Sequence, residues 1–149
     1  NNHNNFENIT FLTNINFNGS NHSWSIAGGN GIPELNGSVK SPNDFSITAP
    51  ADGAMISKSD GIEITWTTST GETNTNILVL IVDIDSESEV ELDIMADDGS
   101  HKIANSELAN ISGEAMIQVV KFTYTSTSSG GKDYYMIAEI INAITVTIN

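Results

Sequence analysis

The residues best suited to chemistry in this chain are carboxylates gathered in one stretch. From Asp83 to Asp98 there are eight acidic side chains and no basic one. Residues two apart on a strand share a face, so Asp83 and Asp85 would lie about 6–7 Å apart. If the chain then turns back, two more carboxylates come opposite them, and hard oxygen ligands of this kind suit calcium. The candidate metal ligands are Asp83, Asp85, Glu91 and Asp93.

The same stretch has a simpler interpretation. It shows neither the spacing of an EF-hand loop nor the repeats of calcium-binding β-rolls. Charged side chains along a sheet edge keep that edge solvated and block pairing with other molecules. We therefore favour a solvated sheet edge and keep calcium as the alternative, with no other cofactor expected.

Aromatic side chains are the second candidate for binding chemistry, because they can stack on sugar rings. Trp66 alternates with Ile62 and Ile64 along a predicted strand, so it is expected in the core. Trp24 follows the polar residues His22 and Ser23. Trp24 is therefore the candidate ligand-binding residue.

No pattern in the chain predicts catalysis. The three histidines (His3, His22 and His101) are scattered, and no metalloprotease or nucleophile-elbow motif occurs. The run from Ser128 to Asp133 resembles a phosphate loop only superficially, since the first glycine and the final Ser or Thr are missing. We predict a hairpin loop there, no catalytic residues, and a protein that is not an enzyme.

The charge balance excludes several classes of partner. The 149 residues include 19 acidic and only 5 basic side chains, all of them lysines, for a net charge of −14. Such a chain is repelled by nucleic acid and by anionic membrane surfaces. No apolar run approaches the length of a membrane span. Because the sequence starts at Asn and not at Met, we expect a processed, exported protein.

Hydrophobic patterning predicts strands almost throughout. The run from Ile62 to Trp66 alternates like a half-buried strand, while the residues from Ile77 to Val82 are apolar on both faces and predict a central strand. Met116–Thr125 is a long strand, and the chain closes with two runs separated by a break near Asn142. Frequent turn signals between short strands predict an all-β sandwich or barrel.

The first 43 residues differ from the rest and are expected to form an N-terminal β-extension. Phe6–Phe17 is predicted to be extended, and the Asn18-Gly19 turn would return the chain as a second arm, His22–Ile26. Asn36-Gly37 predicts another turn. We expect residues 1–43 to pack on a sandwich or to be donated to one, and residues 44–149 to form that sandwich.

From Asp44 onward the chain shows in order Phe45–Pro50, Ile62–Trp66, the apolar strand from Ile77 and the long strand Met116–Thr125. This order of signals resembles an immunoglobulin-like or fibronectin-type-III-like module. A second set of features, which starts before Asp44, follows the order found in a module of bacterial secreted or lipid-anchored surface proteins. They are Trp24, Ser41-Pro42, Ala49-Pro50, Ile64-Thr65-Trp66 and Asp97-Asp98-Gly99. The resemblance implies an antiparallel immunoglobulin-like β-sandwich in an extracellular setting, although the paired cysteines of antibody domains are absent.

Together these features predict a non-catalytic structural or adhesive β-sandwich protein at the cell surface. One alternative is a subunit of an extracellular filament, in which Phe6–Phe17 adds a strand to a neighbouring copy. The other alternative is a carbohydrate-binding module. The expected partners are other surface proteins, polysaccharide, or copies of the chain itself as a homo-oligomer.

Overall fold

The computed structural model describes residues 16–86, 88–91 and 94–149, without the side chain of Glu91. These residues form strands and turns and one short 3-10 segment, Lys58–Asp60. The all-β prediction is confirmed. Within the same residues, no helix has the length and apolar character needed to cross a membrane.

Three sheets account for the strands. The largest has the order β4-β11-β10-β6-β7, with β8 also pairing with β6; its strands are Met55–Ile56, Lys132–Ile148, Gly113–Ser129, Asn76–Asp83, Glu89–Glu91 and, for β8, Met95–Ala96. A second sheet, β3-β5-β9, consists of Ile47–Ala49, Ile62–Trp66 and Ser100–Ile103. A third pairs β1 (Asn21–Ile26) with β2 (Leu35–Lys40). All pairings are antiparallel except that of β4 with β11.

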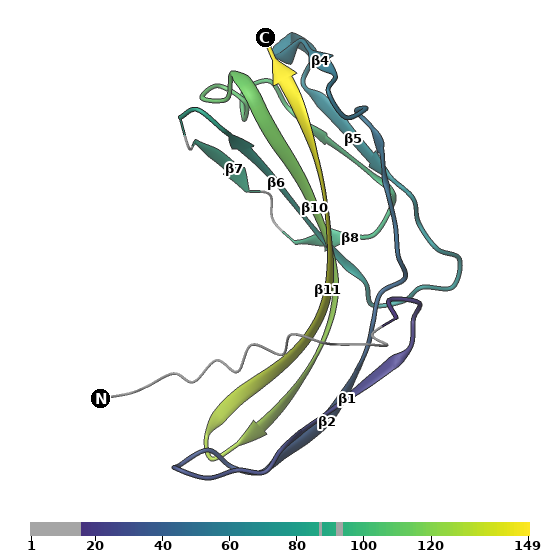
Figure 1. Cartoon of the computed structure of the whole chain (residues 1–149), viewed down its shortest axis with the longest axis vertical. Coiled ribbons are helices and arrows are strands. Elements are labelled where there is room, and N and C mark those ends of the chain that lie inside the picture. The colour runs from purple at the N-terminus through teal and green to yellow at the C-terminus, as the bar shows by residue number, and fades with distance from the viewer. Residues whose placement is uncertain (1–15, 87, 92–93) are drawn as a thin grey trace.

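The long β10–β11 hairpin spans the molecule and unites its two halves. Each strand has 17 residues, and the pair turns at Gly130-Gly131, which confirms the predicted hairpin loop. In Figure 1 the hairpin bows, and both smaller sheets lie along its convex side. One end of the hairpin is covered by β3-β5-β9, and the other end by β1-β2. We call the sheet face toward these layers the inner face and the opposite one the outer face.

The core lies between the inner face and β5. Ile62, Ile64 and Trp66 are buried on one side of β5, as their alternation predicted. Across from them, β6 and β10 contribute alternate buried residues, which are Ile77, Val79, Ile81, Ala115, Ile117 and Val119. The predicted central strand is β6, flanked by β10 on one side and by β7 and β8 on the other.

At the end of the hairpin nearer Gly130-Gly131, hydrogen bonds from β10 hold β2 against it. The Thr125 hydroxyl donates a 3.0 Å hydrogen bond to the Ser38 carbonyl, and Thr123 donates to the carbonyl of Lys40. Gly37 faces Met136, and a Cβ at this glycine would lie 2.6 Å from the Met136 Sδ. The turn predicted at Asn36-Gly37 is therefore wrong, because the glycine serves close packing inside β2.

Two other expectations differ from the structure. No break occurs at Asn142, because β11 runs through it and its side-chain amide donates a 2.9 Å hydrogen bond to the Phe45 carbonyl. The arm His22–Ile26 exists as part of β1, but it pairs with β2. Most of its predicted partner, Phe6–Phe17, falls outside the described residues.

Candidate functional site

A hollow of about 540 Å³ opens between β1-β2 and the first residues of β11, next to the Gly130-Gly131 turn. Its walls are mostly aromatic and aliphatic, with two polar side chains. The lining residues are Trp24, Ile26, Leu35, Thr127, Asp133, Tyr134, Tyr135, Met136 and Ile137. The hollow therefore contains the one ligand-binding residue that the sequence suggested, Trp24.

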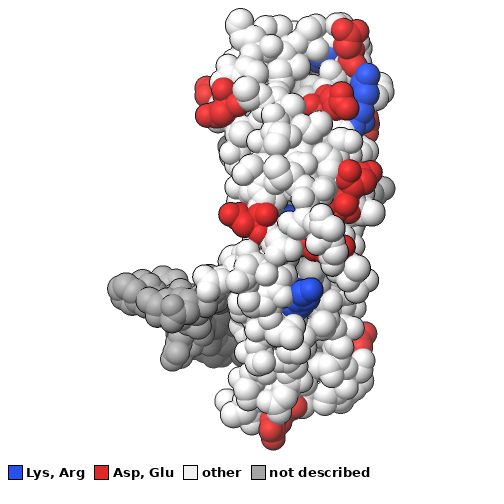
Figure 2. Space-filling view, turned by 90° about the vertical axis from the view of Figure 1, so that its right-hand side faces the viewer, with Lys and Arg blue, Asp and Glu red and all other residues white. Residues whose placement is uncertain are grey.

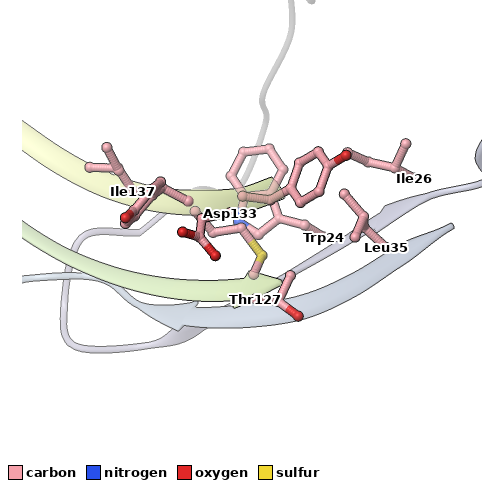
Figure 3. Close-up of a pocket in the computed structure, with 9 residues that line it drawn as sticks. Trp24, Ile26, Leu35, Thr127, Asp133 and Ile137 are labelled. Atoms are coloured by element: carbon pink, nitrogen blue, oxygen red, sulfur yellow. The ribbon is translucent and has the colours of Figure 1, made fainter. Parts of the chain in front are cut away.

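Trp24 is placed there by the β1-β2 pairing. Its register partner is Gly37, which has no side chain and lets β2 approach Met136 on the hairpin. Half of the Trp24 surface stays exposed, at 50%, and Tyr135 is 62% exposed. In Figure 3 Trp24 lies between Leu35 of β2 and Asp133 of β11. Large exposed rings in a hollow are available to a ligand, whereas the buried Trp66 is not.

Aromatic side chains continue beyond the hollow along the outer face. Tyr135 lies 6.2 Å from Tyr124, ring centre to ring centre, and Tyr124 lies 6.5 Å from Phe122. Tyr124 is about half exposed. Tyr135, which lines the hollow, thus connects it to a row of rings that could contact an extended ligand.

The acidic candidates have a different environment. Asp83 is buried at the end of β6, where one carboxylate oxygen accepts hydrogen bonds from the backbone N–H groups of Asp85 (3.0 Å) and Ser86 (2.8 Å). The other oxygen accepts from the Ser112 N–H at 2.9 Å. These donors, Ser112 first, hold the pKa of Asp83 below its usual value. Asp83 therefore ties the β6–β7 turn to the start of β10.

The other three metal candidates do not complete a site in the described structure. Asp85 is exposed, the Glu91 side chain is not described, and Asp93 lies outside the described residues. In the part of the chain that the structure describes, no three His, Cys, Asp or Glu residues form a group that could hold a metal. On the face shown in Figure 2, acidic side chains lie in separate groups along the length of the molecule. The calcium hypothesis stays a prediction.

A buried charged cluster was missed by the sequence analysis. Lys121 of β10 is fully buried, and its Nζ contacts Glu72 Oε2 at 2.6 Å and Asp97 Oδ2 at 2.9 Å. The sequence did hold a signal: on β10, Lys121 continues the alternate positions of the core residues Ile117 and Val119. A lysine on an inner face requires buried partners, but only the tertiary structure identifies them.

Comparisons with protein-family models, curated proteins and solved structures found no match to this chain. The site must therefore be interpreted from its own geometry. His22 lies in β1 and His101 in β9, so the structure places these two histidines in different sheets. The absence of enzymatic activity stays a prediction.

Proposed function

We propose that this protein is a non-catalytic adhesive module of a cell surface that binds polysaccharide in the Trp24 hollow. The observation that carries the proposal is a half-exposed Trp24 in a largely apolar hollow beside Tyr134 and Tyr135. The acidic composition supports an extracellular setting, since it disfavours nucleic acid and anionic membranes as partners. The immunoglobulin-like topology of the two-layered half belongs to the same proposal and rests on the resemblance in sequence.

Sugar rings suit this site because they present both apolar C–H faces and hydroxyl groups. The indole of Trp24 and the phenol rings offer flat apolar surfaces for stacking. The Asp133 carboxylate, whose Oδ1 accepts a hydrogen bond from the Ser128 hydroxyl, can accept hydrogen bonds from sugar hydroxyls, and the Thr127 hydroxyl can donate or accept them. The row from Tyr135 to Phe122 would extend the contact to further sugar units.

The test is a polysaccharide array probed with the parent chain and with Trp24→Ala. We expect the variant to bind at least about tenfold more weakly, since it loses both ring stacking and apolar contact. Met55→Ala is the matched control, because Met55 is exposed but lies on β4, at the end of the molecule far from the hollow. Failure to bind any polysaccharide, or equal binding by the Trp24 variant, would contradict the proposal.

Assembly by strand addition is the second candidate, favoured by the unpaired edge of β11, which is the edge that does not face β10. From Asp133 to Ala143 no described strand pairs with that edge, whereas β4 pairs with it only at Thr147 and Ile148. An unpaired edge can accept an extended segment. The occupant would be residues 6–15 of another copy, whose apolar side chains include Phe6 and Phe11.

Deleting residues 1–15 tests assembly separately from sugar binding. Light scattering after size exclusion should show oligomers of the full chain and only monomers of the shortened one. A Phe6→Asn/Phe11→Asn variant keeps the length and should also be monomeric. A full chain that stays monomeric at high concentration would reject strand addition and leave the polysaccharide proposal untouched.

A further inference from the structure

Lys121, Glu72 and Asp97 form a closed cluster inside the protein, which we call the buried triad. The lysine side chain has no exposed surface, while those of Glu72 and Asp97 are only 9% and 8% exposed. The register partners of Lys121 in the large sheet are Ile77 and Ile140. The amine is thus held against two carboxylates where bulk water has almost no access.

The second oxygen of each carboxylate is also held. Asp97 Oδ1 accepts a 2.7 Å hydrogen bond from the indole Nε1–H of Trp66, and Glu72 Oε1 accepts one of 2.6 Å from the backbone N–H of Asn43. The ring of Phe45 lies beside the amine, with its centroid 5.8 Å from Nζ. Both carboxylates are therefore fixed in orientation toward Nζ, with aromatic rings closing the site.

Such an arrangement favours condensation of an amine with a carboxylic acid. In a site poor in water, charged forms are costly, so an ammonium and a carboxylate can exchange a proton and become neutral. A neutral amine is a nucleophile, and a protonated carboxyl group can release water. Fixed geometry adds an effective concentration of up to about 10⁵–10⁸ M, which offsets the unfavourable equilibrium of amide formation in water.

We propose that the buried triad closes a covalent amide bond between Lys121 Nζ and Asp97 Cγ after the chain has folded. The N–C bond forms as Nζ attacks Cγ, and the C–Oδ2 bond breaks. Two protons from the lysine ammonium leave with Oδ2 as one water molecule, and the third stays on the nitrogen as the amide N–H. No oxidant, reductant or other reactant is needed.

The surrounding groups take distinct parts in this reaction. The Trp66 Nε1–H stabilises the negative charge that develops on Asp97 Oδ1 during attack. Glu72, which makes the shorter contact to Nζ, receives a proton from the amine and delivers it to Oδ2. We assign Asp97 and not Glu72 as the acyl group because its Oδ1, the oxygen that stays in the amide, accepts a hydrogen bond from a neutral side-chain donor, the Trp66 Nε1–H.

The cross-link would join β10 to the segment between β8 and β9, and so tie the large sheet to the β3-β5-β9 layer. Closing a loop by a covalent bond restricts the unfolded chain, as a disulfide does. This sequence has no cysteine and cannot use a disulfide for that purpose. A module that carries load at a surface would gain resistance to unfolding.

Intact-mass spectrometry of the folded full-length chain provides the test. We expect the parent mass to fall short of the sequence mass by one water molecule, and Lys121→Arg to show the full sequence mass. Glu72→Gln keeps a side chain of the same shape but cannot carry the proton, so it should also show the full mass. Lys58→Arg is the control and should keep the deficit, because the Lys58 amine bonds to the Ile111 carbonyl outside the triad.

Peptide mapping by tandem mass spectrometry must then locate the bond. A fragment joining Lys121 to Asp97 would support the proposal. A full-mass parent chain would overturn it. So would a deficit that persists in Lys121→Arg, since a dehydrated Asp-Gly pair such as Asp98-Gly99 loses water too. A bond from Lys121 to Glu72 would overturn the assignment of Asp97 as the acyl group.

Discussion

Replacing Lys121 by Met removes the positive charge of the buried triad and keeps a side chain of similar length. Whether Nζ remains an ammonium or forms an amide, its removal leaves Glu72 and Asp97 buried beside each other. Both carboxylates still accept their outer hydrogen bonds, from Asn43 and Trp66, but nothing balances their charge. The variant should therefore be strongly destabilised.

The magnitude follows from the burial of all three groups. Removing one partner of a buried ion pair costs about 3–5 kcal/mol, because the remaining charge is uncompensated. For a chain of this length, that loss lowers the melting midpoint by roughly 6–20 °C. Urea unfolding followed by tryptophan fluorescence measures the free energy directly, since Trp66 contacts the triad.

A triple variant isolates the charge from the loss of packing. Lys121→Met combined with Glu72→Gln and Asp97→Asn removes every charge, while each amide oxygen can still accept its outer hydrogen bond. This variant should be more stable than Lys121→Met alone by at least about 1 kcal/mol. If the single variant loses less than about 1 kcal/mol, or the triple variant is the less stable, the reasoning about buried charge is wrong.

Three further predictions concern the turns and the hollow. Because the Ser112 N–H lowers the pKa of Asp83, this carboxylate stabilises the fold above its unfolded pKa of about 3.9, and the contribution is lost as the pH falls through the lower folded value. Asp83→Asn should thus be less stable at neutral pH, and its melting midpoint should fall less steeply as the pH is lowered, measured by thermal melts at several pH values. A melting midpoint that falls with pH as steeply as that of the parent chain would contradict this. Gly37→Ala should destabilise by no more than about 1 kcal/mol, because the overlapping atoms are the flexible end of the Met136 side chain, and Met136→Ala should suppress that loss in a double-mutant cycle; additive losses would refute the contact. EDTA should leave the melting midpoint unchanged, since Asp83 already accepts three backbone hydrogen bonds, and a fall of several degrees would support the calcium hypothesis instead.

The periodicity of apolar residues along the chain was sufficient to predict the core strands. Alternation identified Ile62, Ile64 and Trp66 as one buried face, and the apolar run from Ile77 identified a central strand. Both predictions succeed because a strand alternates its side chains between two faces whatever its partner is. The Gly130-Gly131 hairpin is equally local, since its turn needs positive φ values that glycine adopts without strain.

Local signals failed where a distant contact decided the outcome. Gly37 has the residue type of a turn but lies in a strand, because Met136 occupies the space where a side chain would be. Asn142 resembles a strand breaker but is satisfied by the carbonyl of Phe45, far away in sequence. Neither partner can be inferred from the neighbours of these residues in the chain.

The candidate sites, like the strands, were predicted in part from local sequence and in part depend on contacts between distant residues. The sequence by itself determined an acidic composition and predicted an all-β chain, predicted that partners requiring positive charge are disfavoured, and selected Trp24 for its polar neighbours. Only the tertiary structure put Tyr134 and Tyr135 beside that indole and turned the Asp83 carboxylate toward backbone N–H groups. It alone enclosed Lys121 between two acids, because a buried charge is defined by residues that the fold brings together from separate strands and loops.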